Sequence, residues 1–282
     1  MVLKIAVPNK GSLSDLSITA LKEAGYRQRS DSRDLVLIDP ENSVEFYYLR
    51  PRDIAIYVGN GELDAGITGR DLLIDSGANA KEILALDFGK SIFRFAVAVS
   101  SNITDRDLKN KNIATAYPGL LNGYLKDKGI NANIVRLDGA VESAIRLGVA
   151  EVIADVVSTG GTLRQAGLKT IGDPILASEA VLISRNLPSD SKALDVLIRR
   201  LSGVVIARQY VLVDYDIETG KLEDACALTP GFESPTISNL AKAGWSAVRS
   251  MVKRSDINKI MDELYTLGAR GILVTDIHAC RL

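Results

Sequence analysis

One short segment combines a carboxylate with hydroxyl and glycine residues, and this combination suits a phosphorylated sugar. Asp155 ends an apolar run, and a turn follows it directly. The residues of this turn offer hydroxyls or an uncovered backbone: Ser158, Thr159, Gly160, Gly161 and Thr162. Glycines let the chain bend so that successive N–H groups point into one concavity, and a helix starting after the turn would add its positive end. We predict a phosphate cradle with a carboxylate beside it. The alternative is an ordinary strand–turn–helix connection, in which Ser, Thr and Gly are common.

The spacing of this turn excludes the two best-known nucleotide motifs. A Walker loop needs a Lys directly after its last glycine, and Thr162 follows Gly161 here. A dinucleotide-binding fingerprint needs a third glycine further along the helix, which this segment lacks.

Composition limits the remaining chemistry. The 282 residues are 46% hydrophobic and 24% charged, with a net charge of −1, which is typical of a soluble protein of two or three domains. We therefore expect a cytoplasmic protein that binds neither nucleic acid nor membranes. One histidine and two cysteines are too few for a structural zinc site or a thiol–imidazole pair. Any catalysis would use carboxylates, cations, backbone donors and a metal that arrives with the substrate.

The elements that must position these residues alternate between strands and helices. We predict strands at 4–8, 35–38, 44–49, 65–68, 93–100, 112–115, 133–137 and 181–184, and helices at 12–24, 53–60, 119–128 and 140–147. This pattern indicates an α/β fold with mainly parallel sheets in two lobes. Lobe I comprises 1–90 and 185–209, and lobe II comprises 91–184. Residues 210–282 read as βαββαβ, the ferredoxin-like unit.

The chain resembles the long form of ATP phosphoribosyltransferase over nearly its whole length. The most specific segment is 151–163, Glu-x-x-x-Asp-Val-Val-Ser-Thr-Gly-x-Thr-Leu. Similar segments occur elsewhere in the family order, at 7–13, 49–54, 63–72, 114–118, 209–210, 229–236 and 268–269. The resemblance implies a two-lobed, periplasmic-binding-protein-like catalytic region followed by a regulatory domain that binds histidine. Valines at 156 and 157 replace the second acidic residue of the commonest phosphoribosyltransferase class, so the resemblance does not extend to that class.

The resemblance also implies a reaction and its partners. ATP would condense with 5-phosphoribosyl 1-pyrophosphate and release pyrophosphate, in the first step of histidine biosynthesis. Mg²⁺ would be required and would be carried by the substrate phosphates rather than by a protein metal site. Histidine would inhibit the enzyme, which would be a homo-oligomer between dimer and hexamer.

Family residues carry over to the matching positions of this chain. Asp155 would hold the ribose hydroxyls, and residues 158–162 would bind the 5-phosphate. The expected ATP-binding residues are Lys10, Gly11, Arg50, Arg52, Asp71, Leu72 and Tyr117. The basic members among them suit polyanionic substrates in a chain with one histidine, although each could be a solvated surface charge. Lys10 and Glu142 join Asp155 as candidate catalytic residues.

Three of these assignments have structural alternatives. Glu142 could pair with Arg146 four residues along a helix. Asp71 could cap a helix N-terminus, and Tyr117 could be a buried core residue rather than a ring stacked on adenine. In the C-terminal region, Asp216, Ser234 and Thr236 are the candidates for binding histidine, with loop capping as the alternative.

Two rival functions share this architecture. A small-molecule binding protein could have two lobes and an effector domain, but a neutral solute would not need three cations and a hydroxyl-rich loop. A non-catalytic regulatory subunit would not retain an intact donor loop.

Overall fold

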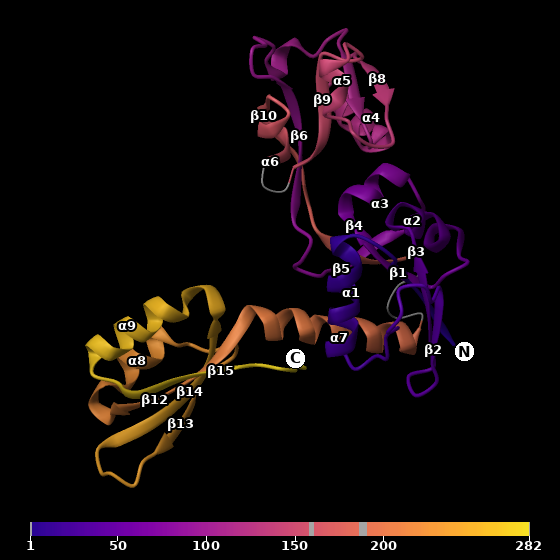
Figure 1. Cartoon of the computed structure of the whole chain (residues 1–282). Coiled ribbons are helices and arrows are strands. Elements are labelled where there is room, and N and C mark those ends of the chain that lie inside the picture. Colours follow the sequence, from indigo (N-terminus) through magenta and orange to yellow (C-terminus); the bar gives the residue numbers. More distant parts are fainter. Residues whose placement is uncertain (1, 158–160, 186–190, 282) are drawn as a thin grey trace. The chain divides into compact units, whose positions relative to one another are not determined.

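The computed structural model describes residues 2–157, 161–185 and 191–281, without the side chain of Thr162. It comprises two compact units, Met1–Lys22 with Tyr26–Ile198, and Glu23–Gly25 with Arg199–Leu282 (Figure 1). The division lies inside helix α7 (Lys192–Gln209), earlier than the predicted domain boundary at 209. The C-terminal half of α7 belongs to the second unit because it contacts that unit. The Arg208 carbonyl, for example, accepts a hydrogen bond from Arg254 Nε at 3.1 Å.

The first unit contains two sheets. The first has six strands in the order β2-β3-β1-β4-β11-β5. Their bounds are Leu3–Pro8 (β1), Val36–Asp39 (β2), Val44–Leu49 (β3), Ala65–Gly69 (β4), Lys81–Ala85 (β5) and Ala180–Ser184 (β11). Its helices are α1 (Ser12–Glu23), α2 (Pro51–Asn60) and α3 (Arg70–Ser76). Ile54, Ala55 and Val58 of α2 pack on this sheet in one buried cluster with Ala6 and Val181, so burial of the apolar face of α2 fixes its direction across the sheet.

The second sheet has five strands in the order β10-β6-β9-β7-β8. Their bounds are Ser91–Ala98 (β6), Asn112–Thr115 (β7), Asn133–Arg136 (β8), Val152–Val157 (β9) and Leu168–Ser178 (β10). Its helices are α4 (Pro118–Asp127), α5 (Ser143–Arg146) and α6 (Gly161–Gln165), with a 3-10 turn at Asp105–Asp107. Leu120, Leu121 and Leu125 of α4 pack against Phe93 and Phe95 of β6 in its core.

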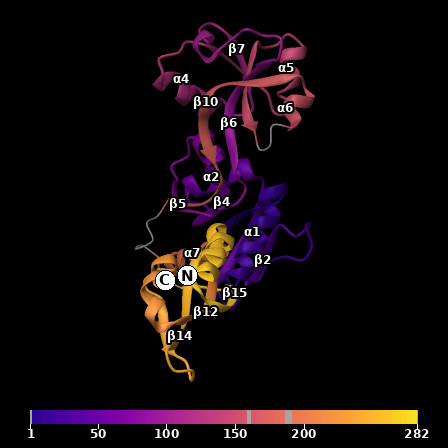
Figure 2. The same ribbon diagram turned by 90° about the vertical axis from the view of Figure 1, so that its left-hand side faces the viewer.

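The chain passes between these two sheets twice. It leaves the first sheet after β5 and returns through β10 to β11, which is inserted antiparallel between β4 and β5. The strands β6 and β10 run side by side next to these crossings (Figures 1 and 2). The predicted end of lobe II at 184 is therefore corrected, because 180–184 completes the first sheet. The two-lobed fold class is confirmed, whereas the expected mainly parallel sheets are mixed.

Two strands and one helix differ from the sequence prediction for local reasons. β5 is a short strand that the prediction missed. The prediction also missed β10, because residues 172–174 have the composition of a turn. In the structure, these residues form a register shift between Ile171 and Leu176 within the strand. Helix α5 is shorter than the predicted 140–147, because Ala140 has a positive φ of 47° that a helix cannot contain.

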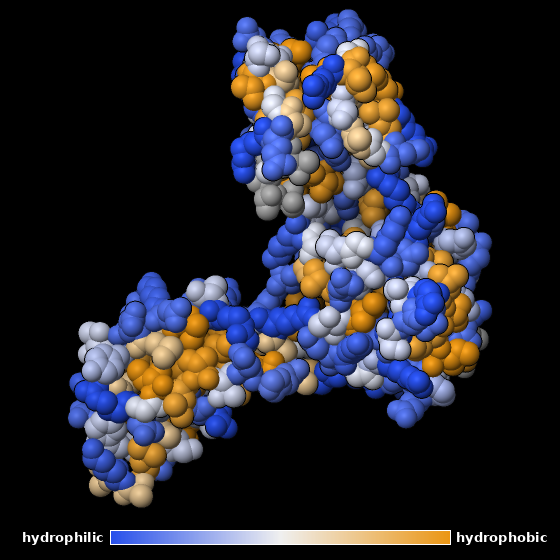
Figure 3. Space-filling view, viewed as in Figure 1, coloured by the Kyte–Doolittle hydropathy of each residue, from blue (hydrophilic) through white to orange (hydrophobic). Residues whose placement is uncertain are grey.

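The second unit is a four-stranded antiparallel sheet with two helices on one face. Its strands are β12 (Tyr210–Glu218), β13 (Thr236–Asn239), β14 (Trp245–Lys253) and β15 (Arg270–Asp276), in the order β13-β14-β12-β15. The helices are α8 (Leu222–Leu228) and α9 (Ile257–Leu267), and 3-10 turns at Thr219–Lys221 and Arg254–Asp256 precede them. This order confirms the ferredoxin-like prediction. In Figure 3, apolar side chains gather in the middle of this unit.

Alternate residues of β12 are buried, and Val211, Val213, Tyr215 and Ile217 form the core with the helices. The opposite face of the sheet is open. Within the described residues, no helix of either unit is long and apolar enough to cross a membrane.

Candidate active site

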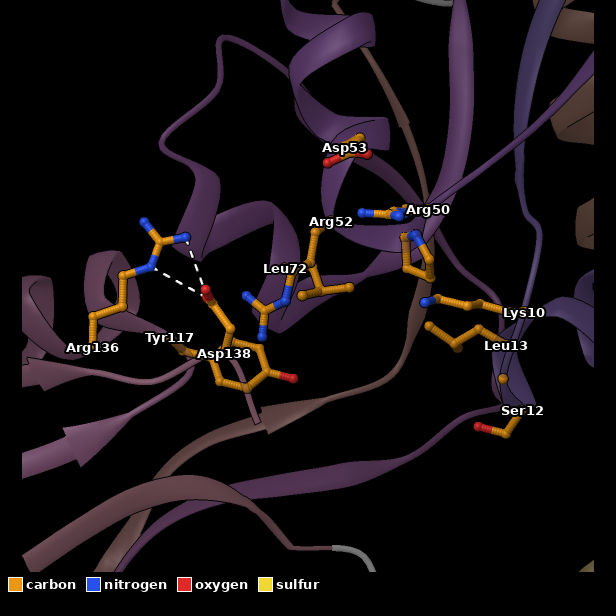
Figure 4. A pocket seen from close by; sticks show the side chains of 12 residues that line it. Lys10, Ser12, Leu13, Arg50, Arg52, Asp53, Leu72, Tyr117, Arg136 and Asp138 are labelled. Carbon is orange, nitrogen blue, oxygen red and sulfur yellow. Dashed lines mark hydrogen bonds and ion pairs between the residues drawn. The ribbon is translucent and has the colours of Figure 1, made fainter. Parts of the chain in front are cut away.

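A polar cavity of about 630 Å³ lies in the first unit, lined by residues from both sheets (Figure 4). Its walls are mostly charged or polar: Lys10, Gly11, Ser12, Leu13, Arg50, Pro51, Arg52, Asp53, Leu72, Tyr117, Arg136 and Asp138. Six of the seven predicted ATP-binding residues are in this set, and Asp71 is the exception.

Strand topology explains why residues so distant in sequence meet here. β3, β1 and β4 are parallel neighbours, so their carboxyl ends lie along one edge of the sheet. Lys10 follows β1, Arg50 follows β3, and α3 with Leu72 follows β4. In the second sheet, Tyr117 and Asp138 follow the parallel pair β7 and β8. The cavity therefore collects side chains from the carboxyl ends of five strands.

Tyr117 lies between the aromatic core and the cavity. Its ring meets Phe93 edge-on at 5.4 Å, and the Arg52 guanidinium lies over it, 4.6 Å from the ring centroid. Burial raises the pKa of Tyr117 above its ordinary value, and the negative charge of Asp71 adds to this, while Arg52 opposes it. The hydroxyl therefore stays protonated at neutral pH and can donate a hydrogen bond.

Asp71 is buried and does not line the cavity. Its side chain accepts a hydrogen bond from the Ser178 hydroxyl at 2.9 Å, and its backbone N–H donates to the same hydroxyl at 3.0 Å. The N-cap residue of α3 is Gly69, which has no side chain, and it is the Ser178 hydroxyl, not the Asp71 carboxylate, that accepts a hydrogen bond from the first turn of the helix. The capping alternative for Asp71 is therefore excluded. Its charge acts on Tyr117 and Asp155 instead.

Asp155 lies on β9 among other acidic side chains. Burial raises its pKa, and the negative charges of Glu142 and Asp71 raise it further, while the Val156 N–H and Arg52 act in the opposite direction. Val156 donates to Asp155 Oδ1 at 2.8 Å. A cation or a set of hydroxyl donors at this point would relieve the repulsion between the carboxylates.

Glu142 is close enough to Asp155 to affect its titration. It occupies the N-cap position of α5 and makes no side-chain capping hydrogen bond. Among the described residues, no ion pair joins Glu142 to Arg146, so the surface-pair alternative receives no support.

The predicted phosphate loop cannot be compared in full. Ser158, Thr159 and Gly160 lie outside the described residues, as does the side chain of Thr162. Gly161 begins the short helix α6, directly after this segment. The loop assignment stays a prediction.

The histidine candidates lie in the second unit. Asp216 of β12 is on the open face of the sheet, because its neighbours Tyr215 and Ile217 point into the core. Thr236 is opposite Arg249, whose side chain pairs with Asp214 at 2.7 Å. These cross-strand partners share a face, so Asp216 and Thr236 are on the same side of the sheet. Ser234 is exposed just before β13.

Six residues that line the cavity were not among the predicted ATP-binding residues: Ser12, Leu13, Pro51, Asp53, Arg136 and Asp138. Arg136 and Asp138 form an exposed ion pair at 3.4 Å at the end of β8. The sequence contained a signal for both, since Arg136 lies at the end of a predicted strand and Asp138 directly follows it, at the edge where ligands are expected.

Together the fold and the cavity define a two-lobed α/β protein with a polar cavity suited to a polyanionic ligand, joined to a ferredoxin-like domain. Family models described as "ATP phosphoribosyltransferase" and "HisG, C-terminal domain" match residues 50–203 and 207–279. The ATP phosphoribosyltransferase of Pseudarthrobacter chlorophenolicus is 61% identical over 284 residues, and that of Arthrobacter sp. (strain FB24) is 59% identical over 286, each across the full length of both chains.

Among solved structures, an ATP phosphoribosyl transferase (HisG:HisZ) complex from Thermotoga maritima is similar, with a TM-score of 0.62 and 25% identity. The match covers 72% of this chain and 98% of the solved chain. The chain therefore belongs to the ATP phosphoribosyltransferase family, in its long form with the additional C-terminal domain. It is a pentosyltransferase of histidine biosynthesis (EC 2.4.2.17). This family membership rules against both non-catalytic alternatives, the small-molecule binding protein and the regulatory subunit.

Proposed function

We propose that the enzyme condenses ATP with 5-phosphoribosyl 1-pyrophosphate in the cavity of the first unit. The observation that carries this proposal is the group of cations Lys10, Arg50 and Arg52 in the cavity wall, together with the carboxylate of Asp155, which does not line the cavity but lies close enough to Arg52 for their charges to interact. Cations suit the phosphates of both substrates, and carboxylates suit the ribose hydroxyls and the positive charge that develops at the ribose.

The reaction needs the two substrates held in line. The lone pair of adenine N1 forms a bond to C1 of the ribose, and the C1–O bond breaks with its electron pair leaving on pyrophosphate. Leu72 and the Tyr117 ring contribute the less polar wall of the cavity, where an adenine base would lie. Holding N1 close to C1 removes much of the entropic part of the barrier.

Charge development gives each group its role. As the C1–O bond breaks, positive charge grows at the ribose and negative charge grows on pyrophosphate. Asp155 and Glu142 would stabilise the first, and the cations Lys10 and Arg52 the second. Because both charges are larger in the transition state than in the bound substrates, these contacts lower the barrier rather than only strengthening binding.

Mg²⁺ fits this site as a partner of the substrate phosphates. Among the described residues, no cluster of three or more His, Cys, Asp or Glu side chains is placed to hold a metal. Mg²⁺ in such enzymes commonly takes one or two carboxylates together with phosphate oxygens, and the repelling carboxylates of Asp155 and Glu142 fit this need. When bound, the ion would neutralise charge on the leaving pyrophosphate.

Histidine would inhibit by binding to the second unit, and the enzyme would be a homo-oligomer of up to six subunits in the cytoplasm. Asp216 could accept hydrogen bonds from the ammonium group of histidine, and the Thr236 hydroxyl could donate one to its carboxylate. Leu273, on the edge strand β15, is 64% exposed, and Ile237 on the opposite edge strand is 48% exposed. Apolar side chains exposed on both edge strands support a subunit interface in this domain.

The reaction is tested by mixing the protein with ATP, phosphoribosyl pyrophosphate and Mg²⁺. We expect pyrophosphate release together with the ultraviolet spectrum of an N1-substituted adenine. Omission of either substrate is the control. Absence of both signals at high enzyme concentration would refute the proposed reaction.

Inhibition is tested by titrating turnover with histidine. For Asp216→Asn we expect the half-inhibitory concentration to rise about tenfold or more, because the ammonium group loses a charged acceptor. Glu218→Gln, at the exposed end of the same strand, is the matched control. An unchanged half-inhibitory concentration for Asp216→Asn would place histidine elsewhere.

A further inference from the structure

We infer that Asp75 is a positioning residue of the active site, holding Arg52 and the helix that carries Tyr117 in register. This inference rests on the proposed function. Asp75 lies near the end of α3 and does not line the cavity itself. Its carboxylate nevertheless contacts both cavity-lining elements, one with each oxygen.

The first oxygen caps α4. Asp75 Oδ1 accepts hydrogen bonds from the backbone N–H groups of Gly119 at 2.8 Å and Leu120 at 3.2 Å. The N-cap residue Tyr117 makes no side-chain capping bond, and Pro118 has no N–H to satisfy. The cap of α4 is therefore supplied by a helix associated with the other sheet. A carboxylate at this end is also favoured by the helix dipole.

The second oxygen holds Arg52. Asp75 Oδ2 lies 3.3 Å from Arg52 Nη1, and the Arg52 guanidinium lies over the Tyr117 ring. The side chain of Asp75 is only 13% exposed, whereas that of Arg52 is 47% exposed. The buried partner therefore fixes the orientation of the accessible one. The Arg52 side chain is one of those that line the cavity (Figure 4).

Close packing makes this arrangement specific. A Cβ placed on Gly119 would collide with the Asp75 carbonyl oxygen. The start of α4 can approach α3 this closely only because residue 119 is glycine. The Asp75 carboxylate thus contacts both Arg52 and the α4 backbone, and its orientation sets where Arg52 points over the Tyr117 ring.

The test is a double-mutant cycle with Asp75→Asn and Arg52→Met, measuring kcat, the KM for ATP, and ATP affinity by calorimetry. Asparagine keeps an oxygen for the α4 cap but loses the charge that orients Arg52. We expect Asp75→Asn to lower kcat/KM for ATP about tenfold in the parent, and less than twofold in the Arg52→Met background. Asp127→Asn, which removes an exposed carboxylate from the far end of α4, is the matched control.

Two outcomes would overturn the inference. An equal fall in both backgrounds would mean that Asp75 does not act through Arg52, and a rise in ATP affinity on Asp75→Asn would mean that it only competes for the guanidinium. Asp75→Ala reports the cap separately, with a fall in Tm of about 2–4 °C. If the parent forms no product, the proposed reaction fails, whereas the ATP affinities of the four proteins still decide the role of Asp75.

Discussion

Two arginine–tyrosine pairs in the first unit have similar stacking but different surroundings. Arg29 lies 4.0 Å from the centroid of Tyr48, and Arg52 lies 4.6 Å from that of Tyr117. Arg29 is 6% exposed, and its guanidinium donates to three carbonyl oxygens, those of Asn9, Ser32 and Asp34. Arg52 is about half exposed, and its one ion pair with a described residue is with Asp75.

The same contrast separates two carboxylates, the buried Asp39 and the partly buried Asp155. Asp39 accepts hydrogen bonds from the Arg27 N–H and from the backbone and side chain of Asn42. Burial favours its protonated form, but these bonds outweigh burial, and the pKa of Asp39 falls below its ordinary value. Burial and neighbouring acids raise the pKa of Asp155.

The difference between Arg29 with Asp39 and Arg52 with Asp155 distinguishes polar groups that stabilise the fold from polar groups that serve function. Around Arg29 and Asp39, each charge is satisfied by nearby backbone groups, which stabilises the fold. Around Arg52 and Asp155, charges face a cavity or each other, and a ligand would satisfy them. We therefore expect changes in the first region to reduce stability and changes in the second to reduce activity.

The largest effect is expected for Asp155→Asn, with a fall in kcat of about 100- to 1,000-fold, because the transition state loses a charged partner. Its raised pKa means that the ionised form costs stability at neutral pH, so Tm should stay equal or rise. Steady-state kinetics and thermal melts measure the two effects. Asp39→Asn should show the reverse pattern, and parent-like turnover by Asp155→Asn would break the comparison.

The next largest effect is expected for Arg29→Met. The carbonyl groups of Asn9, Ser32 and Asp34 lose their buried donor, so the free energy of unfolding should fall by about 2–4 kcal/mol, as measured by urea denaturation. The kcat of the folded fraction should change little. Arg33→Met is the control, because the Arg33 side chain is 88% exposed. A stable but inactive Arg29→Met variant would assign Arg29 to the site instead.

For Arg52→Met we expect kcat/KM for ATP to fall about 10- to 50-fold, which corresponds to about 1.4–2.3 kcal/mol of lost transition-state binding. The free energy of unfolding should change by less than about 0.5 kcal/mol, since the side chain is half exposed. Arg106→Met, at an exposed position, is the control. A larger loss of stability than of activity would mean that Arg52, like Arg29, mainly stabilises the fold.

The smallest effect concerns pH. If Asp155 must be ionised, kcat/KM should fall as the pH drops through its raised pKa, so the acidic limb should lie above the ordinary value of 3.8. Glu142→Gln removes a charge that raises this pKa and should move the limb to lower pH. Arg52→Met removes a charge that lowers it and should move the limb to higher pH. Shifts in the same direction in both variants would contradict this electrostatic account.

The sequence predicted much of the fold because its local signals agreed with the tertiary outcome. The ferredoxin-like order followed from the alternating pattern of β12 and from turn residues between the later elements. The prediction from sequence failed at β10, because Gly172 and Pro174 resemble a turn. Only pairing with β6 shows that the strand continues past them. It also misplaced the return of the chain, since pairing of 180–184 with β4 and β5 is a long-range choice.

For the site, the sequence by itself determined which residue types were available. Cations after β1 and β3, a tyrosine after β7 and an acidic residue near the end of β9 all indicated sites at the carboxyl ends of strands. Arg29 and Arg52, however, could not be distinguished by type, since each is one more arginine near a strand. Only the tertiary structure decided that backbone carbonyls enclose Arg29, whereas Asp75 holds Arg52 beside Tyr117. Whether the hydrogen-bond donors of an arginine are all paired depends on acceptors that folding brings together from distant segments. The local sequence does not specify those acceptors.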